Sequence, residues 1–274
     1  TFFIISFFGI FVYKILNILK LDKIAFILTL VFMFFPIFEA LGFNIINYIG
    51  ITVDGYGEGL AYFFLLLFIY IYFLNEKNNF HFFFFGFLSF LIIGLRPNYL
   101  VLLFSLIISY SAYIIYLNQS KKKFKKIISN IFFMYLGSSF FFLFLTHNLF
   151  YSGEFALLVT KSNLDYNQVM SISDYLILFK SILEGNLNYE IMAKIIHHLR
   201  SYIKPYEIWF MITLINLVVV LFLDLSKKIK ILSISTLLMH STYFLFLGNP
   251  RYSLGTWLIS FMILIYSTYF FLVL

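Results

Sequence analysis

The sequence predicts an all-α protein, a polytopic transmembrane helix bundle of about nine spans with one large extracytoplasmic loop that carries interfacial helices. Hydrophobic residues make up 62% of the 274 residues and charged residues only 11%, and the mean hydropathy is +0.97. Long apolar runs recur between short polar connectors. A bilayer admits only helices or closed barrels, and no strand-like alternation favours a barrel. We therefore treat residues 1–274 as a single transmembrane domain.

The apolar runs define the expected spans. We expect spans at residues 1–13, 24–43, 60–74, 81–95, 99–117, 127–145, 207–223, 231–247 and 254–274. The run 24–43 has the length of about 20 residues that crosses a hydrocarbon core. The first run has no basic segment and no small-residue cleavage site, so it is not a signal peptide. We expect it to be the end of a longer span, and the chain to be an N-terminally truncated fragment.

The distribution of lysine and arginine predicts the orientation of the bundle. Basic residues concentrate in alternate connectors, at 14–23, 77, 121–126 and 227–230. By the positive-inside rule these connectors are cytoplasmic. The connectors at 44–59, 96–98, 147–206 and 248–252 then lie outside. The formal net charge of +7 is modest and clusters in these connectors, so it does not indicate a nucleic-acid partner.

The extracytoplasmic loop at 147–206 is the only long segment that is not apolar enough for a membrane span. Its part at 191–204 has the spacing of an amphipathic helix. The apolar side comprises Met192, Ile195, Ile196, Leu199 and Ile203, and the polar side comprises Glu190, Lys194, His197, Arg200 and Lys204. A helix of about 14 residues is too short to cross a core of about 30 Å. We therefore expect it to lie along the membrane surface.

Asp54 and Glu58 are the candidate catalytic carboxylates, at the outer end of a span. They are four residues apart, so a helix that starts near Gly55 places both on one face. A pair of this kind can act as a general base or bind a cation. The structural alternative is that Asp54 caps the helix and Glu58 interacts with the helix dipole in the first turn.

Arg96, Arg251 and Tyr252 are the candidate phosphate-binding residues. Each arginine lies in a short outer turn beside apolar spans, and an arginine at membrane depth indicates a function. The guanidinium group matches phosphate oxygens with two parallel hydrogen bonds, and a tyrosine can cap a phosphate. The alternative is that these side chains anchor the protein at the lipid headgroups.

The chain has no cysteine and five histidines. The absence of cysteine excludes a disulfide framework, a thiolate nucleophile and a cysteine-based metal site. His197 and His198 are adjacent, so they point about 100° apart on a helix and form a poor metal pair. We expect His240, inside an apolar run, to pack or to form a hydrogen bond. No metal and no cofactor is predicted.

Four short motifs carry a resemblance to a known family. The first is Phe35-Pro36 followed by Thr52-Val53-Asp54-Gly55-Tyr56-Gly57-Glu58, and the second is Gly86-Phe87-Leu88-Ser89-Phe90-Leu91-Ile92-Ile93-Gly94-Leu95-Arg96-Pro97-Asn98. The third is Asn148-Leu149-Phe150-Tyr151-Ser152-Gly153-Glu154-Phe155, and the fourth is Arg251-Tyr252. With these motifs the chain resembles the integral-membrane glycosyltransferases of the C-type superfamily, near the protein-mannosyltransferase and aminoarabinose-transferase branch.

The resemblance implies transfer of a sugar from a polyprenyl-phosphate-linked donor to a lipid, glycan or protein acceptor at the outer face of a bacterial plasma membrane. It implies that Arg251, Tyr252 and Arg96 bind the donor phosphate, and that His147, Asn148 and Glu154 lie on the acceptor side. One departure concerns activity. The family's catalytic aspartate lies in the first outer loop, and no such loop precedes Ile24, so we expect that residue upstream and this fragment to be inactive.

Two other functions remain open at this point. A polysaccharide polymerase or ligase also combines one large outer loop with outer arginines. A transporter is the non-enzymatic alternative, but the sequence has neither repeated halves nor paired interrupted spans. The sequence upstream of Thr1 discriminates between the enzymes, because an outer loop with aspartate favours the transferase.

Overall fold

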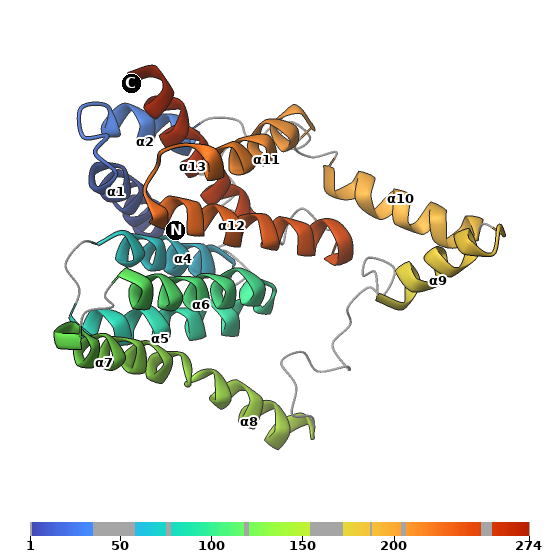
Figure 1. Cartoon of the computed structure of the whole chain (residues 1–274), viewed down its shortest axis with the longest axis horizontal. Helices are drawn as coiled ribbons and strands as arrows, with labels where there is room; N and C mark the ends of the chain where they lie inside the picture. The colour runs from blue at the N-terminus through green and yellow to red at the C-terminus, as the bar shows by residue number, and fades with distance from the viewer. Residues whose placement is uncertain are drawn as a thin grey trace.

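The computed structural model describes residues 2–34, 58–74, 78–117, 121–153, 172–186, 188–203, 207–247 and 254–273. All regular structure in these ranges is helical, which confirms the all-α fold class. The elements are α1 (Phe2–Ile18), α2 (Ala25–Phe34), α4 (Glu58–Phe73), α5 (Asn79–Leu95), η1 (Pro97–Tyr99), α6 (Leu100–Leu117), α7 (Lys121–Ser138), α8 (Phe141–Ser152), α9 (Ile172–Leu183), α10 (Tyr189–Ile203), α11 (Glu207–Phe222), α12 (Lys227–Thr242), η3 (Tyr243–Leu247) and α13 (Leu254–Val273). Figure 1 shows their arrangement.

Three helical segments of the described chain are long and apolar enough to cross a membrane, namely Pro97–Tyr116, Phe124–Tyr151 and Gly255–Leu272. Five further apolar segments are shorter, between 10 and 17 residues. Each of the nine expected runs coincides with part of a helix. Three of them lie in helical segments that are long and apolar enough to cross a membrane. The remaining spans stay predictions.

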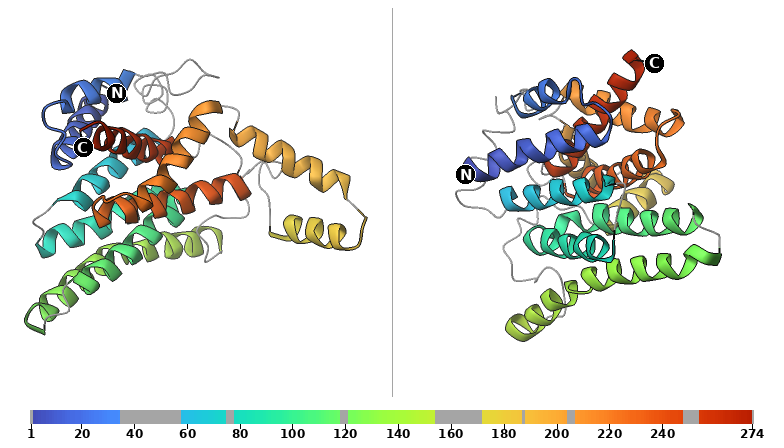
Figure 2. Two further views of the ribbon diagram at one scale, coloured as in Figure 1. Left: turned by 45° about the horizontal axis from the view of Figure 1, so that its top comes forward. Right: turned by 90° about the vertical axis from the view of Figure 1, so that its left-hand side faces the viewer.

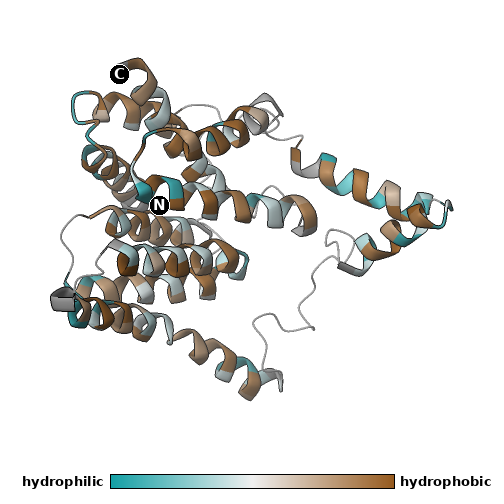
Figure 3. Cartoon of the chain, in the orientation of Figure 1, coloured by the Kyte–Doolittle hydropathy of each residue, from teal (hydrophilic) through white to brown (hydrophobic). Residues whose placement is uncertain are grey.

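The helices of the bundle consist mostly of apolar residues, as Figure 3 shows by hydropathy. Large hydrophobic side chains are exposed on several helices, including Phe26, Phe132, Ile215 and Phe271. A soluble monomer rarely exposes contiguous apolar surface on this scale. This surface is that of a protein surrounded by lipid.

The pair α5 and α7 packs through small residues. A Cβ added to Gly86 would collide with the backbone carbonyl of Met134, and one added to Gly137 would collide with that of Phe83. Glycine at both positions lets the two backbones approach, which is how helices commonly pack in membranes. The lysines at 121–126, expected in a connector, form the first turns of α7.

α8 and the pair α9–α10 project from the bundle (Figures 1 and 2). The expected helix at 191–204 is confirmed as α10, Tyr189–Ile203. α8 continues to Ser152 and ends at Gly153, whose φ of 77° is the left-handed conformation that favours glycine. The first residues of the expected loop at 147–206 are therefore helical.

Candidate functional site

A buried hydrogen bond joins the turn after α5 to the first turn of α13. The Tyr99 hydroxyl accepts from the backbone N–H of Gly255 at 2.9 Å. Tyr99 is only 1% exposed, and the ring of Tyr62 on α4 meets its ring edge-on, with centroids 6.4 Å apart. A Cβ added to Gly255 would collide with the Tyr99 hydroxyl and with Leu65, so this approach requires glycine. We call Tyr62, Tyr99 and Gly255 the Tyr99 junction.

The Tyr99 junction holds the candidate Arg96 at one end of the bundle. α5 ends here because Pro97 disfavours helical conformation at the residue before it, and Arg96 has φ −146° and ψ 89°. The Arg96 N–H donates to the Ile92 carbonyl at 2.7 Å, and the Arg96 carbonyl accepts from the Tyr99 N–H at 3.1 Å. The half-buried arginine therefore extends from backbone that is fixed on both sides.

Two more candidates are close to the junction along the chain. Glu58 is the first residue of α4, one helical turn before Tyr62. Arg251 precedes Gly255 by four residues, which extend over at most about 14 Å. Four candidate residues lie outside the described ranges: Asp54, Glu154, Arg251 and Tyr252. The start of α4, the Arg96 turn and the start of α13 thus lie at one end of the bundle.

His147 and Asn148, expected on the acceptor side, lie on α8. The His147 ring is 4.6 Å from the Tyr151 ring between centroids, and its Nδ1 is 3.5 Å from the Asn148 Oδ1. The views in Figures 1 and 2 place α8 and α13 on opposite sides of the bundle. α8 meets the end of α5, however, because a Cβ added to Gly94 would collide with the Phe144 ring. His147 and Asn148 follow Phe144 by about one helical turn.

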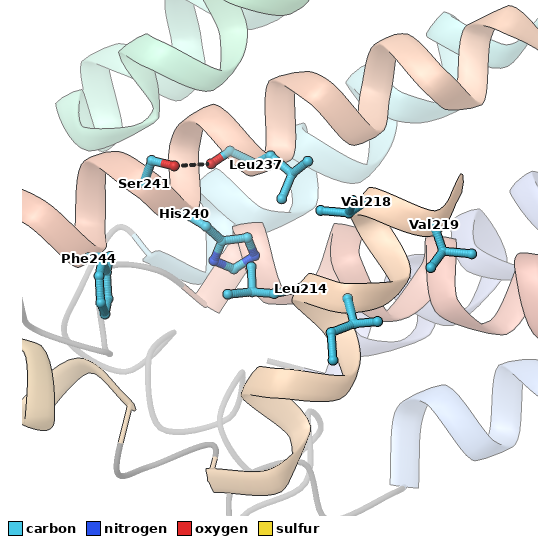
Figure 4. A pocket seen from close by; sticks show the side chains of 8 residues that line it. Leu214, Val218, Val219, Leu237, His240, Ser241 and Phe244 are labelled. Atoms are coloured by element: carbon cyan, nitrogen blue, oxygen red, sulfur yellow. Dashed lines mark hydrogen bonds between the residues drawn. The ribbon is translucent and has the colours of Figure 1, made fainter. Parts of the chain in front are cut away.

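A groove of about 440 Å³ lies between α11 and α12. Its wall is almost entirely hydrocarbon, and the lining residues include Leu214, Ile215, Val218, Leu237, His240 and Phe244 (Figure 4). The groove is open to the outside of the bundle, because Ile215 and Val218 are about half exposed. Its shape and lining suit a flexible hydrocarbon chain.

His240 connects this groove to α13. The His240 Nε2 is 2.7 Å from the Ser260 hydroxyl oxygen, and that hydroxyl donates to the Thr256 carbonyl at 2.9 Å. Because the Ser260 hydroxyl proton is already donated to the Thr256 carbonyl, the His240 Nε2 must carry a proton and donate it to the Ser260 oxygen. The His240 ring also meets the Trp257 ring at 4.6 Å between centroids. The expectation of a packed, hydrogen-bonded histidine is confirmed.

A π-helical segment, η3, follows α12 beside the groove. Such segments are rare and often occur at functional sites. The α9–α10 hairpin docks on η3: the Tyr175 hydroxyl donates to the Leu245 carbonyl, and His198 hydrogen-bonds with the backbone at Phe244 and Tyr243. His198 is 5% exposed, and this burial lowers its pKa below the ordinary value, while the backbone hydrogen bonds oppose that shift.

Sequence reasoning missed Tyr99, Gly255 and His198. The first two each lie three or four residues after a candidate arginine, but their contact joins segments 156 residues apart. The sequence pattern places His197 on the polar side of the 191–204 helix and assigns no side to His198, and the structure exposes His197 and buries His198. The helical pattern does not show which of two adjacent histidines faces a neighbouring element.

Among the described residues, no group of three or more histidine, aspartate and glutamate side chains could hold a metal ion. Comparisons with protein-family models, curated proteins and solved structures found no match for this chain. The functional interpretation therefore depends on the Tyr99 junction and on the groove.

Proposed function

We propose that this chain belongs to a membrane glycosyltransferase that moves a sugar from a polyprenyl-phosphate-linked donor to a lipid, glycan or protein acceptor at the outer face of a bacterial plasma membrane. The observation that carries the proposal is the Tyr99–Gly255 hydrogen bond. It ties the Arg96 turn to the helix start that follows Arg251. In the proposal, Arg96 and Arg251 together bind one phosphate group, because guanidinium groups match phosphate oxygens with parallel hydrogen bonds.

The groove supports a lipid-linked donor. Its wall includes His240, which bonds to Ser260 on α13, five residues after Gly255. A single ligand with a phosphate near the junction and an isoprenoid tail in the groove would contact both. Hydrocarbon gains no hydrophobic free energy by leaving lipid for an apolar groove. The groove therefore contributes packing and orientation, and the phosphate contacts contribute specificity.

The proposed chemistry is a substitution at the anomeric carbon. A carboxylate, Asp54 or Glu58, takes the proton of the acceptor hydroxyl. The acceptor oxygen bonds to the anomeric carbon, while the bond from that carbon to the phosphate oxygen breaks. Negative charge develops on the departing lipid phosphate, where the guanidinium groups of Arg96 and Arg251 stabilise it.

In this proposal the apolar helices form a multi-pass bundle of about nine spans, with the 147–206 loop outside. The α9–α10 hairpin lies at the membrane surface. Its exposed apolar side chains support that placement, and they include Leu176, Phe179, Leu183 and Ile196. The ion pair between Lys194 and Asp174, 3.4 Å apart, holds the two helices together.

Two measurements test the proposed function. Membranes that contain the full-length gene product should transfer sugar from at least one member of a panel of polyprenyl-phosphate sugars, and no transfer from any member contradicts the proposal. The second measurement is binding of polyprenyl phosphate to the purified chain. Arg96→Ala and Arg251→Ala should each weaken it about tenfold or more, the value of a charged hydrogen bond. Arg251→Lys should lose part of the affinity, because it keeps the charge but not the planar fork.

The chain provides a matched control for these arginines. Arg200 is exposed on α10, so Arg200→Ala should bind polyprenyl phosphate like the wild type. Equal affinity of the Arg96, Arg251 and Arg200 variants would make all three arginines headgroup anchors and remove the phosphate site.

A further inference from the structure

The opposite end of the bundle holds a second cavity of about 620 Å³. Its polar lining residues are Lys20, Tyr113, Ser226, Lys228, Tyr266 and Tyr269. The helix α13 runs from Gly255 at the junction to Tyr269 at this cavity, which is about 21 Å at 1.5 Å per residue. The cavity is therefore separate from the proposed donor site.

The charged lining of this cavity is cationic. Lys20 and Lys228 line it, and none of the described lining residues is acidic. Asp22 and Asp224 occur in the adjoining connectors but do not line the cavity. A cavity with this lining attracts an anion.

Lys228 has a fixed position. Its ammonium group donates to the carbonyls of Phe73 at 3.3 Å and Leu74 at 3.1 Å, at the end of α4. Its own carbonyl accepts from the Tyr72 hydroxyl at 2.9 Å. These bonds anchor the start of α12 against the end of α4. The cation is therefore held in place before any ligand arrives, which lowers the entropy cost of binding.

Hydrogen-bond donors surround these cations. The hydroxyls of Tyr113, Tyr266 and Tyr269 come from α6 and α13. The Ser226 hydroxyl oxygen accepts from the Ile229 N–H at 3.4 Å and so caps α12, whose positive dipole end is at this cavity. Two ammonium groups, several hydroxyls and a helix start together match the several acceptor oxygens of a phosphate.

Apolar side chains form the rest of the wall. Ile18, Leu19 and Phe270 line the cavity. Beyond Phe270, the end of α13 exposes Phe271 and Leu272 to the outside, 56% and 80% exposed respectively. A ligand whose phosphate lies in the cavity can thus extend hydrocarbon along the exposed end of α13.

We propose that this cavity binds the phosphate headgroup of an anionic phospholipid, with its acyl chains against the end of α13. The cavity is built from the ends of α1 and α4, from α6 and α13, and from the start of α12. The bound lipid therefore bridges helices that are distant in the sequence and stabilises the bundle. This site does not depend on the proposed transferase activity.

The test uses the purified chain in a non-ionic detergent. Adding phosphatidylglycerol should raise its Tm, and native mass spectrometry should detect one retained phosphatidylglycerol molecule. Phosphatidylcholine, which has no net charge, should do neither at the same concentration. Inorganic phosphate should leave Tm unchanged. If inorganic phosphate reproduces the shift, the ligand is a soluble phosphate, and the lipid proposal is wrong.

Substitutions connect the effect to this cavity. Lys20→Gln should weaken phosphatidylglycerol binding about tenfold, the value of one charged hydrogen bond. Tyr269→Phe should weaken it less, because it removes a neutral donor. Lys230→Gln is the matched control, since Lys230 is on α12 but does not line the cavity. Equal affinity of the Lys20 and Lys230 variants, or equal shifts with both lipids, would overturn the proposal.

Discussion

Removing the Tyr99 hydroxyl should loosen the end of the bundle that carries the proposed donor site. In Tyr99→Phe, the buried N–H of Gly255 loses the acceptor 2.9 Å away. An unsatisfied buried donor costs about 1–3 kcal/mol. Gly255→Ala disturbs the same contact through the other residue, because the added Cβ collides with the Tyr99 ring and with Leu65. Such overpacking costs about 1–3 kcal/mol.

The double variant Tyr99→Phe/Gly255→Ala tests whether the two substitutions act on the same contact. Phenylalanine at position 99 removes the oxygen that the new methyl group meets first, although the ring carbon beside it remains in the way. The double variant should therefore lose about 1 kcal/mol less unfolding free energy than the sum of the losses in the two single variants, which is within the range for residues in direct contact. Independent effects would instead add.

Unfolding by SDS in mixed micelles, monitored by circular dichroism, gives the free energy of unfolding for each variant. Tyr135→Phe is the control for the hydroxyl, since Tyr135 is 45% exposed on α7. Gly9→Ala is the control for the methyl group, because nothing lies within 4 Å of the added Cβ, and alanine is the better helix former. A Tyr99→Phe variant as stable as Tyr135→Phe, with Gly255→Ala as stable as Gly9→Ala, would refute the junction.

Two further predictions concern the loop. Ser162→Cys, but not Ser120→Cys, should react with an impermeant thiol reagent on intact cells, because the lysines at 121–126 predict a cytoplasmic connector; the reverse labelling would overturn the topology. Because burial lowers the His198 pKa below 6.5 in the folded chain, the unfolded chain holds the proton more tightly, and stability is lost as pH falls through the folded-state pKa. The wild type should therefore lose more unfolding free energy than His198→Gln when the pH is lowered from neutral; parallel losses would contradict a role for this histidine.

The sequence by itself determined the helical fold class and several helix boundaries. Composition excludes a soluble domain, and the period of apolar residues predicted α10 within two residues at each end. The pair Arg96-Pro97 predicted the end of α5, because proline acts on its immediate neighbour. These features depend on neighbours within a few residues, so a local pattern reports them.

Only the tertiary structure decided which of these segments meet. Tyr99 and Gly255 are 156 residues apart, and neither has a local signal for their contact. Gly86 and Gly137 are required because each lies against the backbone of the other's helix, where a Cβ would collide. His198 is buried because η3 lies against α10. Each depends on the packing of distant helices, where position in space and not residue type sets what a side chain contacts.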